Sequence, residues 1–105
     1  MPSGVLYADY LTPNANTATS PVAANKLQTV DAHIVNMAST PATVKVFVGT
    51  NNSPGNNKTL VEPVILNKGG KIRIGGAILA ATERIVMHTD GDMVAARVTC
   101  FEEDA

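Results

Sequence analysis

The stretch "RIVMHTDGDMVAARVTCF", residues 84–101, decides the fold class of this 105-residue chain. Its apolar side chains recur at every second position on both sides of Asp90–Gly91, a period typical of half-buried β-strands. Asp-Gly is also the preferred pair for a two-residue type I′ turn, because both central residues need positive φ. We therefore predict a β-hairpin over residues 84–101, with Cys100 on the core side of its second strand.

The same alternation continues toward the N-terminus in three further segments: "TVDAHIVNM" (residues 29–37), "ATVKVFVG" (residues 42–49) and "GKIRIGGAI" (residues 70–78). A fourth, "TLVEPVIL" (residues 59–66), contains Pro63, which lacks a backbone donor, so we place this strand at an edge or a bulge. We expect a polar loop over residues 49–58 and a hairpin closed by "NKGG" (residues 67–70). Six or seven strands with regular turns predict an all-β fold, an antiparallel β-sandwich, and leave open whether it is a jelly roll.

The N-terminal part of the chain differs from the rest in composition and in hydrophobic pattern. "LTPNANTATSPVAANK" (residues 11–26) is rich in Pro, Asn and small residues and has no periodicity. We predict an extended N-terminal arm over residues 1–24, with a short strand near residues 5–10, followed by a sandwich domain over residues 25–105. The arm is expected either to be mobile or to lie along a neighbouring subunit.

Composition excludes several classes of function. Lys plus Arg total 8 and Asp plus Glu total 9, so the net charge of −1 gives no reason to expect binding to nucleic acid or to an anionic membrane. A single cysteine permits no internal disulfide. The first residues have no basic n-region, and no apolar run reaches the ~20 residues of a membrane span.

The glycines of "NKGGKIRIGGAIL" (residues 67–79) raise the question of a phosphate-binding loop. Lys71 is followed by Ile72 and by a strand-like segment, whereas a Walker loop needs Ser or Thr and a helix. We interpret Gly69 and Gly70 as turn residues, and Gly75 and Gly76 as a bulge or a close backbone approach. The sequence contains no metal-ligand spacing, so we expect no metal site, no cofactor and no enzyme activity.

Apolar residues also occupy strand positions that should face water, and the arm carries apolar residues of its own. A cluster of such residues would mark an interaction surface; the alternatives are that inner and outer faces are exchanged in some strands, or that these residues are scattered singly. The predicted interface residues are Leu6, Tyr7, Tyr10, Leu11, Val35, Met37, Phe47, Val86, Met93 and Phe101. They predict a homo-oligomer or a subunit bound to a larger assembly.

Two stretches of the chain carry a family resemblance. "PVAANKLQTVDAHIVNMASTPATVKVFVG" (residues 21–49) and "GGAILAATERIVMHTDGDMVAARVTCFEE" (residues 75–103) resemble small virion structural proteins of tailed bacteriophages. The shared features are a Thr-Val-x-Val strand, a Glu-Arg-Ile-Val strand, a small-residue hairpin and a Phe-Glu ending. The long Asn-rich loop and the N-terminal arm depart from that pattern.

This resemblance implies a non-enzymatic virion structural protein, made in the host cytoplasm. It implies a capsid decoration or cement subunit that binds the assembled shell through its arm and an apolar sheet face. A neck, tail or fibre component remains an alternative, as does a carbohydrate-binding module for host recognition. The implied partners are other virion proteins, such as the major capsid protein or neck and tail proteins, with no nucleic acid and no membrane.

Overall fold

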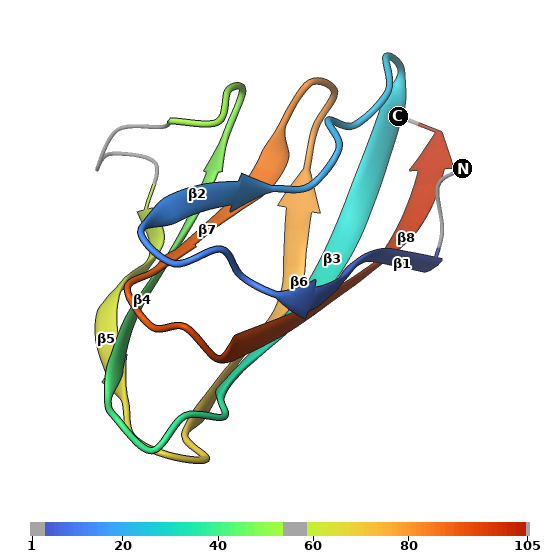
Figure 1. The fold of residues 1–105 in the computed structure, drawn as a ribbon. Coiled ribbons are helices and arrows are strands. Elements are labelled where there is room, and N and C mark those ends of the chain that lie inside the picture. Colours follow the sequence, from blue (N-terminus) through green and yellow to red (C-terminus); the bar gives the residue numbers. More distant parts are fainter. Residues whose placement is uncertain (1–3, 54–58, 105) are drawn as a thin grey trace.

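The computed structural model describes residues 4–53 and 59–104 of the chain. Within these ranges all regular structure is β-strand, as the alternating sequence predicted (Figure 1). The strands are β1 (Gly4–Tyr10), β2 (Ala15–Ala18), β3 (Lys26–Asn36), β4 (Ala42–Gly49), β5 (Thr59–Leu66), β6 (Lys71–Leu79), β7 (Arg84–Thr89) and β8 (Val94–Asp104).

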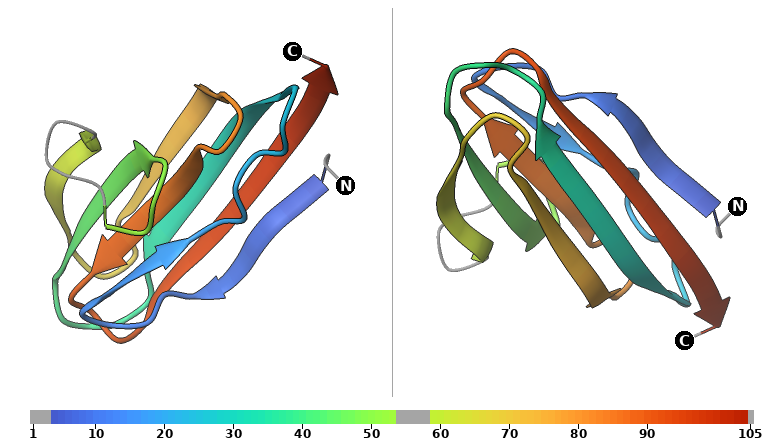
Figure 2. Two further views of the ribbon diagram at one scale, coloured as in Figure 1. Left: turned by 90° about the horizontal axis from the view of Figure 1, so that it is seen from above. Right: turned by 90° about the horizontal axis from the view of Figure 1, so that it is seen from below.

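The strands form two four-stranded antiparallel sheets that pack face to face, which confirms the predicted β-sandwich. Sheet A has the order β1-β8-β3-β6 and sheet B the order β2-β7-β4-β5 (Figure 2). In both sheets the first strand in the chain pairs with the last: β1 with β8 and β2 with β7, then β3 with β6 and β4 with β5. The first four strands thus pair in order with the last four, as in one long hairpin that is folded into two sheets.

The core lies between the sheets and is built from the predicted alternation. Val30, Ala32 and Ile34 of β3 face inward, and the same is true of alternate residues in β4 and β8. Cys100 is 9% exposed and belongs to this core, as predicted. Fully burying one Val or Ile side chain contributes about 1.5–3 kcal/mol, so this shared inward face is the main stabilising feature of the sandwich.

The N-terminal segment differs from the predicted arm. β1 pairs with β8 and β2 pairs with β7, so residues 4–18 complete an edge of each sheet. Leu11 and Val22 are 1% and 2% exposed and lie in the core, and Leu11 N donates to Val94 O at 2.8 Å. The physical reason is that β7 and β8 would otherwise leave a row of backbone N–H and C=O groups unpaired. The described part of the predicted arm is therefore part of the sandwich.

The predicted hairpin over residues 84–101 is wrong, although both of its strands exist. β7 lies in sheet B and β8 in sheet A, so residues 90–93 cross between the sheets. Neither Asp90 nor Gly91 is among the described residues with positive φ, which a type I′ turn requires. Instead Thr43 N donates to Asp90 Oδ1 at 2.8 Å, which holds the crossing against β4. Gly91 is needed for space, because a Cβ there would lie 2.6 Å from Ala42 Cβ.

The connection at residues 67–70 also joins the two sheets instead of closing a hairpin, since β5 lies in sheet B and β6 in sheet A. Gly69 has φ +76°, as expected for a turn glycine. β5 is an edge strand, as the presence of Pro63 predicted. Residues 54–58 of the predicted polar loop lie outside the described residues.

The glycine pair at residues 75–76 forms the predicted bulge in β6. Along the β3–β6 pairing, Val30 faces Ala77 while Ala32 faces Ile74, so the register shifts between them. Gly76 has φ +73°, and its N–H donates to Asp31 Oδ1 at 3.1 Å. The shift changes which β6 side chains face outward beyond the bulge, and this determines where Ile78 points.

Candidate interaction surface

The outward face of sheet A, called here the A-face, is the candidate functional site. Residues directly opposite one another on antiparallel strands point to the same side of a sheet, so the pairings divide this face into rows. Four rows follow from the registers: Tyr10–Ala95–Val35–Lys71, then Ala8–Arg97–His33–Arg73, then Val5–Thr99–Asp31, then Phe101–Thr29–Ile78.

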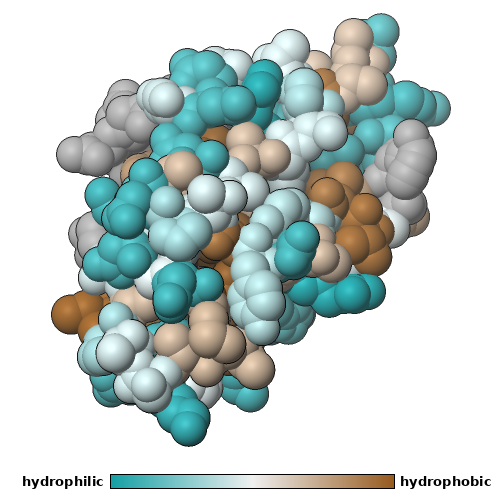
Figure 3. Space-filling view, viewed as in Figure 1, coloured by the Kyte–Doolittle hydropathy of each residue, from teal (hydrophilic) through white to brown (hydrophobic). Residues whose placement is uncertain are grey.

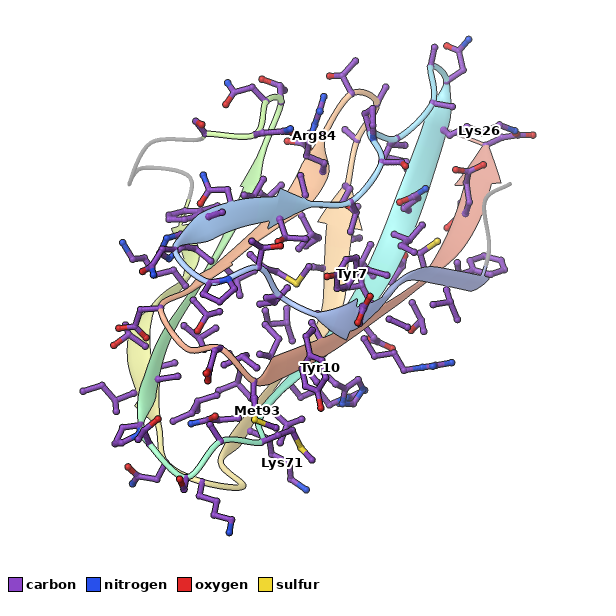
Figure 4. The ribbon with its side chains drawn as sticks, viewed as in Figure 1. Tyr7, Tyr10, Lys26, Lys71, Arg84 and Met93 are labelled. Carbon is purple, nitrogen blue, oxygen red and sulfur yellow. The ribbon has the colours of Figure 1, made fainter. Side chains whose placement is uncertain are left out.

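One end of the A-face gathers four of the predicted interface residues. Tyr10 is 49% exposed and shares a row with half-buried Val35. Met37 and Met93 are 51% and 42% exposed, and their backbones are joined by the hydrogen bond from Met37 N to Met93 O at 2.9 Å. Figure 4 shows Tyr10, Met93 and Lys71 toward the same end of the molecule, with Lys26 toward the other. We call this group the Met end.

The opposite end of the A-face holds a second apolar group, called here the Phe end. Phe101 and Ile78 are 62% and 66% exposed and flank Thr29 in one row, and Val5 of the next row is 48% exposed. From Ala95 to Phe101 the two ends are about 20 Å apart, at ~3.3 Å per strand residue. The face therefore offers two separate apolar contact areas.

A basic band separates these two ends. Arg97, His33 and Arg73 lie side by side in one row, and Arg97 and Arg73 carry positive charge. Asp31 offsets part of that charge, with its Oδ1 3.9 Å from Arg73 Nη2. The band gives the A-face a positive centre on a chain whose net charge is −1, which favours a partner with an acidic strip between two apolar areas.

The outward face of sheet B does not expose its two predicted interface residues. Phe47 is 6% exposed and Val86 is 0% exposed, although both point away from the core. The segment that follows β4 is held against this side of sheet B: Asn52 O accepts from Asn16 Nδ2 at 2.8 Å, and Asn52 Oδ1 accepts from Arg84 Nη1 at 3.1 Å. The prediction that Phe47 and Val86 form a free contact surface is therefore wrong.

Three predicted interface residues near the N-terminus also pack within the protein and are not fully exposed on its surface. Leu11 is a core residue, and Leu6 and Tyr7 pack partly buried against the core. The Tyr7 hydroxyl donates to Tyr10 O at 2.6 Å. Partial burial, followed by the nearby Asp9 carboxylate, raises the pKa of Tyr7. Of the predicted aromatic contacts near the N-terminus, Tyr10 is the one left largely open to solvent.

Among the residues whose exposure the structure describes, sequence reasoning missed three exposed large apolar residues: Val5, Ile65 and Ile78. Unbroken alternation would place Ile78 on the same side of the strand as Ile72 and Ile74, but the bulge at Gly75–Gly76 turns it outward. The glycine pair was the available signal, because a bulge changes the inside–outside alternation that follows it. On the side of the molecule seen in Figure 3, hydrophobic residues appear as separate spots among hydrophilic ones.

The described residues contain no group of three or more His, Cys, Asp or Glu side chains that could hold a metal ion. His33 lies on β3 of sheet A and His88 on β7 of sheet B, so the two histidines belong to different sheets. Burial, followed by the charge of Glu102, raises the pKa of the Cys100 thiol, which disfavours a reactive thiolate. In the part of the chain that the structure describes, no helix is long and apolar enough to cross a bilayer.

Comparisons of the sequence with protein-family models and with curated proteins find no match.

Proposed function

We propose that the chain is a non-enzymatic structural subunit of a bacteriophage virion that decorates the assembled capsid by docking its A-face on other virion proteins. The observation that carries this proposal is the pair of exposed apolar ends on one sheet face, the Met end and the Phe end. Apolar side chains left in water at two separated places favour attachment to a partner that covers both.

The fold supports the proposal by analogy. We interpret the orders β1-β8-β3-β6 and β2-β7-β4-β5 as those of an eight-stranded jelly roll, an architecture used by viral capsid and lectin domains. A fold alone does not fix a function, so the weight rests on the A-face and on the sequence resemblance described above. A rigid sandwich suits a shell subunit, which must present a fixed surface to its neighbours.

The sequence suggested that the N-terminal arm contacts the shell, and this proposal assigns those contacts to the A-face instead. Residues 4–18 complete the sheets of their own chain, and Tyr10 is their contribution to the Met end. Weak contacts at each subunit add up over a multivalent shell through effective concentration, so neither apolar end needs to bind tightly alone. The same surface would support a homo-oligomer on the shell.

The test is attachment to shells that lack the chain. Purified protein is mixed with such shells from the phage that encodes it, and bound protein is measured by co-sedimentation. We expect saturable binding that falls strongly for Phe101→Ser and Met93→Ser. Ile65→Ser is the matched control, because Ile65 is 67% exposed on the outward face of sheet B. No binding, or equal losses for all three variants, would refute the proposal.

A neck, tail or fibre position is the alternative within the same class. Sedimentation of the isolated protein separates the two: a stable ring favours the neck or tail, whereas a small species that assembles only on shells favours decoration.

A carbohydrate-binding module is a second candidate, favoured by one observation. Tyr10 lies on the outward face of a sheet with 49% exposure, and aromatic side chains on such faces are suited to stacking against sugar rings. Binding to a glycan array that is lost in Tyr10→Ser would support this function, and an array without signal would reject it.

A further inference from the structure

A hollow of about 320 Å³ lies where β1 and the segment between β2 and β3 meet β3 and β8, and Val5 is the one A-face residue among the residues that line it. This volume is at the lower end of the range for small-ligand pockets. Its apolar walls come from Val5, Leu6, Pro21 and Ala23, and its polar groups come from Ser20, Gln28 and Glu102.

Gln28 is the main polar group of the hollow. It is 5% exposed, and one of the two ends of its side-chain amide lacks a hydrogen-bond partner among the described residues. Its Nε2 donates to Glu102 Oε1 at 3.0 Å, which fixes the orientation of the amide. Its Oε1 is buried and accepts no hydrogen bond from any described residue. A buried carbonyl without a donor destabilises a fold, so such a group in a pocket wall indicates that a donor is supplied from outside.

The charge of the wall indicates what kind of donor that is. Glu102 brings a carboxylate to the same wall as the Gln28 carbonyl. The hollow therefore combines hydrogen-bond acceptors and a carboxylate with apolar walls. A ligand that fits this combination carries a cationic N–H donor at the end of an alkyl chain.

We propose that this hollow binds a primary alkylammonium group, with the ammonium at Gln28 Oε1 and Glu102 and the alkyl stem along Val5, Leu6 and Pro21. A free aliphatic amine and the lysine side chain of a partner protein share this chemistry. The inference rests on the pocket alone and does not depend on the proposed virion function.

The test is a titration of the isotopically labelled full chain, followed by amide chemical shifts in NMR. The probes are n-butylammonium and, as the neutral equivalent of the same length, n-butanol. We expect saturable shifts at Gln28, Glu102 and Ala23 with a Kd on the order of millimolar for n-butylammonium, and at least about tenfold weaker binding of n-butanol.

Two variants and a matched control complete the test. Glu102→Gln removes the charge, and Gln28→Met removes the unpaired carbonyl at similar length; each should weaken n-butylammonium by about tenfold or more. Glu103→Gln makes the same change of charge on the neighbouring residue, which does not line the hollow, and should leave binding within about twofold. Dispersed spectra of each variant confirm that it is folded.

A third probe distinguishes the two sources of the ammonium group. Nα-acetyl-lysine methylamide that binds as well as n-butylammonium indicates a partner's lysine side chain, and much weaker binding indicates a small free amine; both outcomes support the pocket. Absence of saturable shifts, equal binding of n-butanol, or an equal loss in Glu103→Gln would overturn the proposal.

Discussion

Asn36, at the end of β3, gives the sharpest prediction about how the two sheets are joined. Its side chain is 0% exposed. Its Nδ2 donates to Thr40 O at 2.9 Å and to Leu66 O at 2.8 Å, and its Oδ1 accepts from Ala38 N at 3.0 Å. One amide therefore connects a sheet A strand to the turn leading into β4 and to the last residue of β5 in sheet B.

Replacement by leucine tests this role at similar volume. Asn36→Leu removes three hydrogen bonds, each with a net contribution of about 1 kcal/mol, and leaves buried backbone groups without partners. We expect the free energy of unfolding to fall by about 3 kcal/mol or more, a large part of the ~5–15 kcal/mol typical of a domain. For a domain of this size the melting temperature should fall by roughly 12–24 °C.

The assay is urea denaturation followed by circular dichroism, with a thermal melt as a second measurement. Asn16→Ala is the control, because Asn16 makes one exposed hydrogen bond, from Nδ2 to Asn52 O, and should cost about 0.5 kcal/mol or less. A loss below about 1 kcal/mol for Asn36→Leu, or one equal to that of the control, would refute the assigned role.

Asn36→Asp separates the donor role from the acceptor role. The carboxylate can still accept from Ala38 N, but it places negative charge against the carbonyls of Thr40 and Leu66. Burial beside carbonyl oxygens raises the folded-state pKa of such a carboxyl group above its unfolded value. The variant should therefore lose stability as pH rises through that pKa and recover part of it in acid, where the protonated group donates one hydrogen bond.

Three further predictions concern packing, pH and thiol reactivity. Gly91→Ala should cost about 1–3 kcal/mol in urea denaturation, because its Cβ would lie 2.6 Å from Ala42 Cβ; adding Ala42→Gly should recover much of that loss, and no recovery would refute the clash. The ion pair with Lys26 lowers the pKa of Asp104 below 3.8, so its contribution to stability is present above that pH and is lost as pH falls through the lowered value. A carboxyl titration by NMR should show the Asp104 pKa return toward 3.8 in Lys26→Gln, and an unchanged pKa would contradict the pairing. Because Cys100 is buried and its pKa is raised, alkylation should be much slower in the native protein than in urea, and equal rates would contradict its burial.

The strands themselves were predictable from the sequence, because period-2 alternation is a local property. The predicted segments at residues 42–49, 59–66 and 84–89 coincide with β4, β5 and β7. Which sheet a strand joins was not predictable, since it depends on contacts between residues distant in sequence. The hydrogen bond from Thr43 N to Asp90 Oδ1 is such a contact, and the Asp-Gly pair alone gave the wrong turn.

The candidate interface was predictable only in part, for a similar reason. Phe47 and Phe101 have the same alternating context in the sequence, yet they are 6% and 62% exposed. Their difference comes from what lies above each sheet. Hydrogen bonds to Asn52 hold the segment after β4 against sheet B, whereas Phe101 on sheet A stays open. The sequence of either strand alone therefore does not predict which of the two phenylalanines is exposed.

The contrast between the two outward faces is the strongest reason to look for a partner on the A-face. Sheet B keeps Phe47 and Val86 out of water with residues of its own chain, at the cost of burying the Arg84 Nε without a partner. Sheet A leaves Phe101 and Ile78 in water, where their exposure adds little to the stability of the isolated chain. The chain therefore covers Phe47 and Val86 in the middle of sheet B, and Ile65 on the edge strand β5 is the large apolar residue that stays exposed on that face among the described residues. An apolar surface left open on the other side gains free energy only when a second protein covers it, which makes binding, and not folding, the property that Phe101→Ser and Met93→Ser should change.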